Sequence, residues 1–230
     1  MMPRITLEVQ HMKDIRVNMV NRVEPKTIRI ENWQNRDYLV IPSYTLPDNS
    51  VLNGGLYPKA EIDKAWVTLE GTLAPIGHPF VTNDDGGIEY VSAHHPVALT
   101  QFHGGVHNRN VKRDGHRVYS EKWVDIDYAS RNEPGKRLLA AVNYDAETGT
   151  VNGPSSPIHT STGLILQQED APAGMPYKWI ARNMRLDHDA ILLKEVGAAT
   201  PEQGVGLMVN TADAVPPVSY THLRAHETSL

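Results

Sequence analysis

Hydrophobic and polar positions alternate along several short stretches of the chain, and this period of two is typical of β-strands that bury one face. The most informative stretch runs from Pro157 to Leu166, where β-branched and apolar residues dominate. One face of this predicted strand carries Ile158, Thr160, Thr162, Leu164 and Leu166, and the other carries His159, Ser161, Gly163 and Ile165. The first face is predicted to lie against the core.

The second face places the hydroxyl of Ser161 close to Gly163, which has no side chain. A serine on a rigid strand beside open space is one way in which a protein displays a nucleophile. The same pattern also occurs in ordinary strands built of small residues. The strand by itself leaves both interpretations open.

Further strands are expected at residues 14–23, 27–31 and 38–44, although Pro42 and Pro47 favour an edge or a loop for the last of these. Asn53-Gly54-Gly55 marks a turn, and Asp114-Gly115 predicts a hairpin between strands 106–112 and 117–125. Helical spacing of apolar residues predicts helices at 58–68 and 136–144. The range 71–107 is rich in Gly, Pro, Asn, Asp and His and is expected to be mainly loop. Residues 177–193 are expected to form two strands or one long bent one.

These elements predict an α+β, β-rich fold with a partly closed mixed or antiparallel sheet or barrel and two or three helices. We expect an N-terminal extension at 1–11, a single domain at 12–212 and a tail at 213–230. Residues 218–228 (VSYTHLRAHET) resemble a translated sequencing adapter. Residues 218–230 are therefore expected to be an artefact, and the natural protein is expected to continue beyond Pro217.

Composition narrows the class of protein. The chain has 230 residues, a hydrophobic content of 40% and a formal net charge of −5. It has no run of about 18 apolar residues that would cross a membrane, and its charges are interspersed, so neither a membrane nor a nucleic-acid partner is expected. With no cysteine in the chain, disulfides, thiolate nucleophiles and cysteine-ligated zinc are excluded.

Histidine is unusually frequent, with eleven copies. A metal-dependent hydrolase is one hypothesis, because His94, His95, His103 and His107 supply imidazoles in one stretch. Their spacing argues against a shared site, since Gly104 and Gly105 separate the last two and no carboxylate accompanies them. We therefore expect solvated loop histidines, with no metal and no cofactor.

A serine nucleophile needs a neighbouring base, and the base works best when a third group fixes its orientation. His78 lies in a Gly-His-Pro turn whose proline restricts the histidine backbone. His188 is in phase with Met184, Leu186, Ala190 and Leu192, so it should be buried. Such a histidine is ordinarily a hydrogen-bonded core residue, and the same burial suits an orienting residue.

Four segments in order resemble a family of tailed-phage and prophage proteins of unassigned function, itself similar to the prohead maturation proteases and herpesvirus assembly proteases. The segments are Leu73–Pro79 with its His-Pro pair, Gly105–Asp125 with its Asp-Gly turn, Ser161-Thr162-Gly163-Leu164, and Met184–Leu192 with its central histidine. Together they cover roughly residues 68–197. The resemblance rests on the four segments taken together in this order.

The resemblance implies a prohead-protease-like fold and a Ser-His-His serine protease, with Ser161 as nucleophile, His78 as general base and His188 as orienting residue. Its expected partners are phage scaffold and capsid proteins, with self-association left open. Its expected location is the host cytoplasm and the interior of the phage prohead.

One departure concerns the oxyanion site. Relatives carry a Gly-Arg pair after the second histidine motif, whereas this chain has Lys194-Glu195-Val196-Gly197. Lys194 or backbone N–H groups near Gly197 are the expected substitutes. The alternative is a non-catalytic phage head assembly or structural protein with the same fold.

Overall fold

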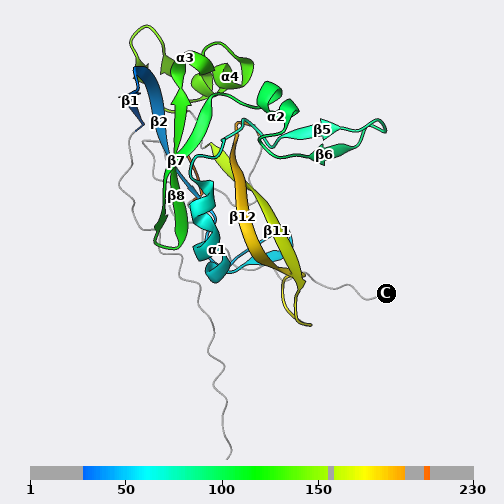
Figure 1. Ribbon diagram of the computed structural model, residues 1–230. Coiled ribbons are helices and arrows are strands. Elements are labelled where there is room, and N and C mark those ends of the chain that lie inside the picture. Colours follow the sequence, from blue (N-terminus) through cyan, green and yellow to red (C-terminus); the bar gives the residue numbers. More distant parts are fainter. Residues whose placement is uncertain (1–27, 155–157, 195–204, 208–230) are drawn as a thin grey trace, which may run out of the picture.

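The computed structural model describes residues 28–154, 158–194 and 205–207. Two β-sheets dominate these residues, and short helices cover their flanks (Figure 1). The fold is α+β and rich in strands, as the sequence predicts. Within the described ranges no sheet closes into a barrel, and four short α-helices replace the expected two or three. The predicted strand at 14–23 and the predicted tail lie outside these ranges.

The first sheet is antiparallel and has the order β1-β2-β8-β7, with β13 paired to β2. The predicted Asp114-Gly115 hairpin is confirmed and joins β7 to β8. The bounds are β1 Arg29–Trp33, β2 Arg36–Thr45, β7 Val106–Asp114, β8 Arg117–Asp125 and β13 Gly206–Leu207.

Strand β2 lies inside this sheet, so the expectation that Pro42 and Pro47 favour an edge strand or a loop at 38–44 is wrong. On one side, β8 pairs along β2 from Tyr38 to Thr45. The pairing with β1 ends at Val40 and the pairing with β13 begins at Ser43. Pro42 falls between these two ladders, where a missing N–H removes no hydrogen bond to either strand.

The second sheet has the order β11-β12-β4-β3 and is mixed, because β12 and β4 run parallel. Its principal part is the β11–β12 hairpin, in which β11 contains the predicted Ser161 strand and forms the edge. The Asn53-Gly54 turn joins the two short strands as predicted. The bounds are β3 Ser50–Leu52, β4 Gly55–Tyr57, β11 His159–Asp170 and β12 Trp179–Leu192.

Short helices flank the two sheets (Figure 1), and helical residues contribute to each of the two buried apolar clusters. Helix α1 and the following 3-10 helix η1 confirm the prediction at 58–68 and pack against β12. Helix α4 confirms the prediction at 136–144 but begins earlier, where the Asn132 side chain accepts the Gly135 N–H. The bounds are α1 Lys59–Ala65, η1 Trp66–Leu69, α2 Pro96–Gln101, α3 Ile126–Ala129 and α4 Glu133–Ala141.

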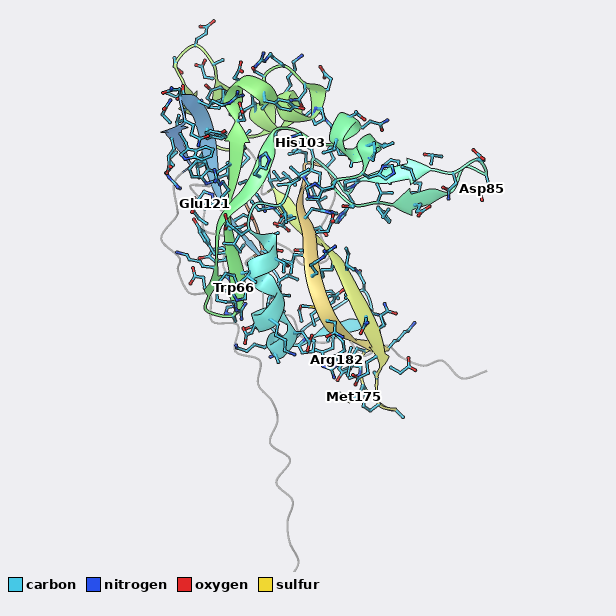
Figure 2. The ribbon with its side chains drawn as sticks, in the orientation of Figure 1. Trp66, Asp85, His103, Glu121, Met175 and Arg182 are labelled. Atoms are coloured by element: carbon cyan, nitrogen blue, oxygen red, sulfur yellow. The ribbon has the colours of Figure 1, made fainter. Side chains whose placement is uncertain are left out.

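The stretch at 71–107 is less irregular than expected, because it holds α2 and a hairpin of strands β5 Phe80–Thr82 and β6 Ile88–Tyr90. This hairpin projects from the body, with Asp85 at its outer tip (Figure 2). A further small hairpin joins β9 Tyr144–Asp145 to β10 Thr150–Val151. None of the helices described is long and apolar enough to cross a membrane.

A buried ion pair joins the two sheets. Lys122 on β8 and Asp189 on β12 are both 0% exposed, and Lys122 Nζ lies 2.5 Å from an Asp189 carboxylate oxygen. Lys122 also donates to Asn108 Oδ1, while the other carboxylate oxygen of Asp189 accepts hydrogen bonds from Thr45 and Thr162. The charges are therefore compensated on both sides of the interface, as burial requires.

We expect Asp189→Ala to lower the free energy of unfolding by about 3–5 kcal/mol, because it leaves the Lys122 ammonium buried without a counter-charge. The double variant Lys122→Met/Asp189→Leu should lose less than this single variant, since neither charge remains. Urea unfolding followed by circular dichroism measures both. The control is Glu169→Gln in the exposed Arg182–Glu169 pair, which should change stability little. A double variant less stable than Asp189→Ala would contradict this account of the pair.

Candidate active site

Ser161 and His188 share one face of the β11–β12 hairpin. In the antiparallel register Ser161 lies opposite Ala190, and Gly163 lies opposite His188. Residues directly opposite each other point to the same side of a sheet, so these four residues share one face. Thr162 and Asp189, also opposite each other, face the first sheet. Around Ser161 the two faces of β11 are therefore as predicted, with Ser161 and Gly163 on one face and Thr162 on the other.

Gly163 makes room for the His188 ring. A Cβ atom at Gly163 would overlap Cε1, Nε2 and Nδ1 of the His188 ring. His188 is 5% exposed, so the ring has little freedom to move aside. The missing side chain at Gly163 therefore serves the histidine on the neighbouring strand.

His78 reaches the same place from a separate segment. The chain from Pro75 to Gly77 runs beside β12, where Gly77 N–H donates to Ile191 O at 2.9 Å and Ile191 N–H donates to Pro75 O at 2.8 Å. Gly77 has a φ of +85°, which turns the chain after this pairing. His78 Nδ1 then lies 3.1 Å from His188 Nε2, a hydrogen-bonding distance.

The other nitrogen of His188 contacts a carboxylate that the sequence analysis did not single out. His188 Nδ1 lies 2.7 Å from Asp187 Oδ2. Neighbouring residues of a regular strand point to opposite faces, but a bulge interrupts β12 here, because Leu164 pairs with Leu186 while Gly163 pairs with His188. Asp187 is the extra residue. Ser92 Oγ and Ala93 N–H donate to its carboxylate at 2.6 and 2.9 Å.

The bulge also changes the expected phase of His188. Leu186 lies opposite Leu164 and packs in the second apolar cluster, whereas His188 lies on the face of Ser161. The expected alignment of His188 with Met184 and Leu186 is therefore wrong. His188 is buried as expected, with the His78 ring and Gly163 among its neighbours.

Two titratable groups of the site, His78 and Asp187, have pKa values shifted from their ordinary range. Burial lowers the pKa of His78, and the neighbouring His188 lowers it further, while Asp189 acts in the opposite direction. Burial alone would raise the pKa of Asp187. The hydrogen bonds from His188, Ser92 and Ala93 outweigh burial and hold that pKa well below its usual range. Asp187 is therefore a carboxylate at neutral pH.

Ser161 is half-buried and lines a pocket at the edge of β11. Of the described groups, none forms a hydrogen bond with its hydroxyl, and none bonds to His78 Nε2. Successive residues on one strand face are about 7 Å apart, so Ser161 is one such step from the Gly163–His188 contact. The pocket wall includes Leu46, Leu52, Tyr57 and Leu164.

Among the described residues, none of the remaining candidates shares a hydrogen bond with this group. Lys194 is exposed just beyond the end of β12, and Gly197 lies outside the described residues. His94 is exposed, and His95 Nδ1 accepts the Val97 N–H at the start of α2. His103 and His107 contact each other edge to face with ring centroids 5.7 Å apart. The described chain has no group of three metal-ligating side chains.

No family model matches the sequence, and no curated protein matches it. Among solved structures, the "bacteriophage T4 capsid assembly protease, gp21" aligns with a TM-score of 0.43 and 17% sequence identity. The alignment covers 72% of this chain and 91% of that chain.

We expect Gly163→Ala to displace the His188 ring and break its hydrogen bond to His78. Overpacking of this kind costs about 1–3 kcal/mol of stability. Histidine side-chain NMR should show the loss of the His78–His188 contact, and urea unfolding gives the stability change. Gly174→Asn is the control, because Gly174 has a φ of +85° and open space around it, and asparagine tolerates that backbone. An unchanged histidine spectrum in Gly163→Ala would contradict the close packing.

Stability should fall as the pH is lowered from 7 to 5. A histidine whose folded-state pKa lies below the unfolded value of about 6.5 binds fewer protons when folded, so its contribution is complete above that pH and is lost as pH falls through the folded pKa. Burial lowers the pKa of His78, His103 and His107 in this way. Urea unfolding at each pH measures the loss. The variant His78→Gln should reduce the change in unfolding free energy per pH unit. A stability that rises on acidification over this range would contradict the assignment.

Proposed function

We propose that the protein is a phage prohead maturation serine protease that cleaves scaffold or capsid proteins by a Ser-His-His mechanism. The observation that carries the proposal is the 3.1 Å contact between His78 Nδ1 and His188 Nε2 beside the strand that bears Ser161. These residues come from segments far apart in the sequence. The contact between His78 and His188 supports the proposal, because the family resemblance of the sequence requires these two residues to meet.

In the proposed reaction Ser161 Oγ attacks the carbonyl carbon of a peptide bond, and its proton passes to His78 Nε2. His78 then gives the proton to the leaving amine as the C–N bond breaks. Water hydrolyses the acyl-enzyme by the reverse sequence, and the serine regains its proton. Lys194 and N–H groups near Gly197 remain the candidates for stabilising the oxyanion.

Two features of the site suit a peptide substrate. Within the described residues, β11 from Ser161 onward has a strand neighbour on one side only, so its outer edge can pair with an extended chain. The small pocket that Ser161 helps to line has both apolar and hydroxyl-bearing walls, Leu164 and Thr162 among them, which suits a substrate side chain of mixed polarity. We expect the substrate to bind along this edge.

Ser161→Ala should abolish labelling by a fluorophosphonate, along with any self-cleavage or cleavage of a scaffold partner, while the fold persists. His78→Ala should slow labelling by about 10²–10⁴-fold, because it removes the general base. Intact-mass spectrometry measures the adduct, and circular dichroism checks the fold. Ser130→Ala is the control, since Ser130 is exposed on another face and only donates to the Asp127 carbonyl.

One observation favours the second candidate, a non-catalytic phage head assembly protein with the same fold. The Ser161 hydroxyl and the His78 ring are not hydrogen-bonded to each other in the part of the chain described. If the wild-type protein resists the fluorophosphonate and Ser161→Ala processes partners equally well, this second function replaces the first.

A further inference from the structure

Asp187, His188 and His78 form a continuous chain of polar contacts that ends at a free imidazole nitrogen. Asp187 Oδ2 contacts His188 Nδ1 at 2.7 Å, and His188 Nε2 contacts His78 Nδ1 at 3.1 Å. In the described residues His78 Nε2 has no hydrogen-bond partner. This series of hydrogen bonds therefore runs from a partly buried carboxylate towards the side of the site where a base is needed.

Hydrogen-bond chemistry assigns the protons along this chain. An ionised carboxylate only accepts hydrogen bonds, so His188 Nδ1 must carry its proton. In a neutral imidazole the other nitrogen is then an acceptor, so His188 Nε2 accepts from His78. His78 Nδ1 must donate, which leaves His78 Nε2 with a lone pair. One carboxylate thus fixes the tautomers of two rings.

Without that carboxylate the assignment would not be unique. His188 could carry its proton on Nε2 and donate it to His78 Nδ1. His78 Nε2 would then carry a proton and could not accept one from a serine. The carboxylate also supplies a fixed negative charge that stabilises a protonated pair of imidazoles, a charge that a second histidine alone lacks.

The position of Asp187 is built into the fold by the bulge in β12. The N–H group next to the bulge, on Leu186, donates to Thr68 Oγ1 of η1 at 2.9 Å. On its outer side the Asp187 carboxylate is held by Ser92 and Ala93, in the loop after β6. Two elements outside the sheet therefore hold the extra residue in place.

We propose that Asp187 is a positioning residue that acts through His188 to hold His78 in the tautomer with an unprotonated Nε2. The inference rests on the proposed function for its catalytic consequence, but the tautomer assignment stands independently of activity. The titratable groups around the two rings are Asp187 on their own face, Asp189 on the opposite face where Lys122 pairs with it, and Tyr90, whose ring is 6.1 Å from that of His78.

The first test measures the rate of fluorophosphonate labelling of Ser161 against pH in the full chain. Asp187→Asn keeps an acceptor for His188 but loses the charge, so the acid limb of the profile should move about one unit to lower pH. Asp187→Ala loses both, so its plateau rate should also fall about ten-fold or more. Asp84→Asn, at the exposed end of the β5–β6 hairpin, is the matched control. Profiles of both Asp187 variants identical to wild type would overturn the inference.

The second test reads the tautomers directly from the ¹⁵N resonances of the histidine rings. We expect wild-type His188 to be protonated on Nδ1 and His78 to have an unprotonated Nε2, and this population should be lost in Asp187→Ala. Thermal melting confirms that the variant is folded, and Asp187→Leu, which has a similar volume and no acceptor, serves if it is not. The same tautomers in wild type and Asp187→Ala would overturn the inference.

The two tests separate the inference from the proposed function. If the wild-type protein is not labelled but the tautomers change with Asp187→Ala, the positioning role stands and the protease hypothesis fails. If labelling requires Ser161 and His78 but is indifferent to Asp187 at every pH, the protease hypothesis stands and the positioning role fails.

Discussion

The geometry of this protein depends on the buried contact between Lys122 and Asp189. It joins β8 of the first sheet to β12 of the second, with both side chains fully removed from solvent. A buried pair of opposite charges is tolerated only in a narrow geometry, because each charge loses its hydration. Asp189 directly precedes Ala190 and follows His188, so the contact fixes the strand at the point where the histidine site is built. Stability and site geometry therefore rest on the same residues.

The site is assembled by departures from regular strand structure. A bulge in β12 places Asp187 beside His188, and the second irregularity in this strand lies near Asn183, whose N–H donates to Glu61 of α1. Bulges free backbone N–H groups from the ladder. In this fold side chains of α1 and η1 accept two such N–H groups, and apolar residues of the same helices pack against β12. The helices thus hold the strand in its irregular form.

Much of this could be predicted from periodicity and turn chemistry. The Asp114-Gly115 and Asn53-Gly54 turns, the strand containing Ser161 and both longer helices follow from local rules. The pairing of His78 with His188 was suggested by resemblance, and no local pattern contains it. Asp187 was missed, because an alternating pattern assigns neighbouring residues to opposite faces. A bulge depends on acceptors such as Thr68, which the chain supplies more than a hundred positions earlier.

Contact between Gly163 and His188 links two positions in different strands. A side chain at 163 and an imidazole at 188 cannot both occupy the space between them. A sequence that keeps this fold but carries a larger residue at 163 must therefore have given up the histidine or moved its ring. Glycine at position 163 of the sequence therefore indicates that a ring from one strand packs against the backbone of its neighbour. The smallest residue of the strand is thus one whose identity is tightly constrained.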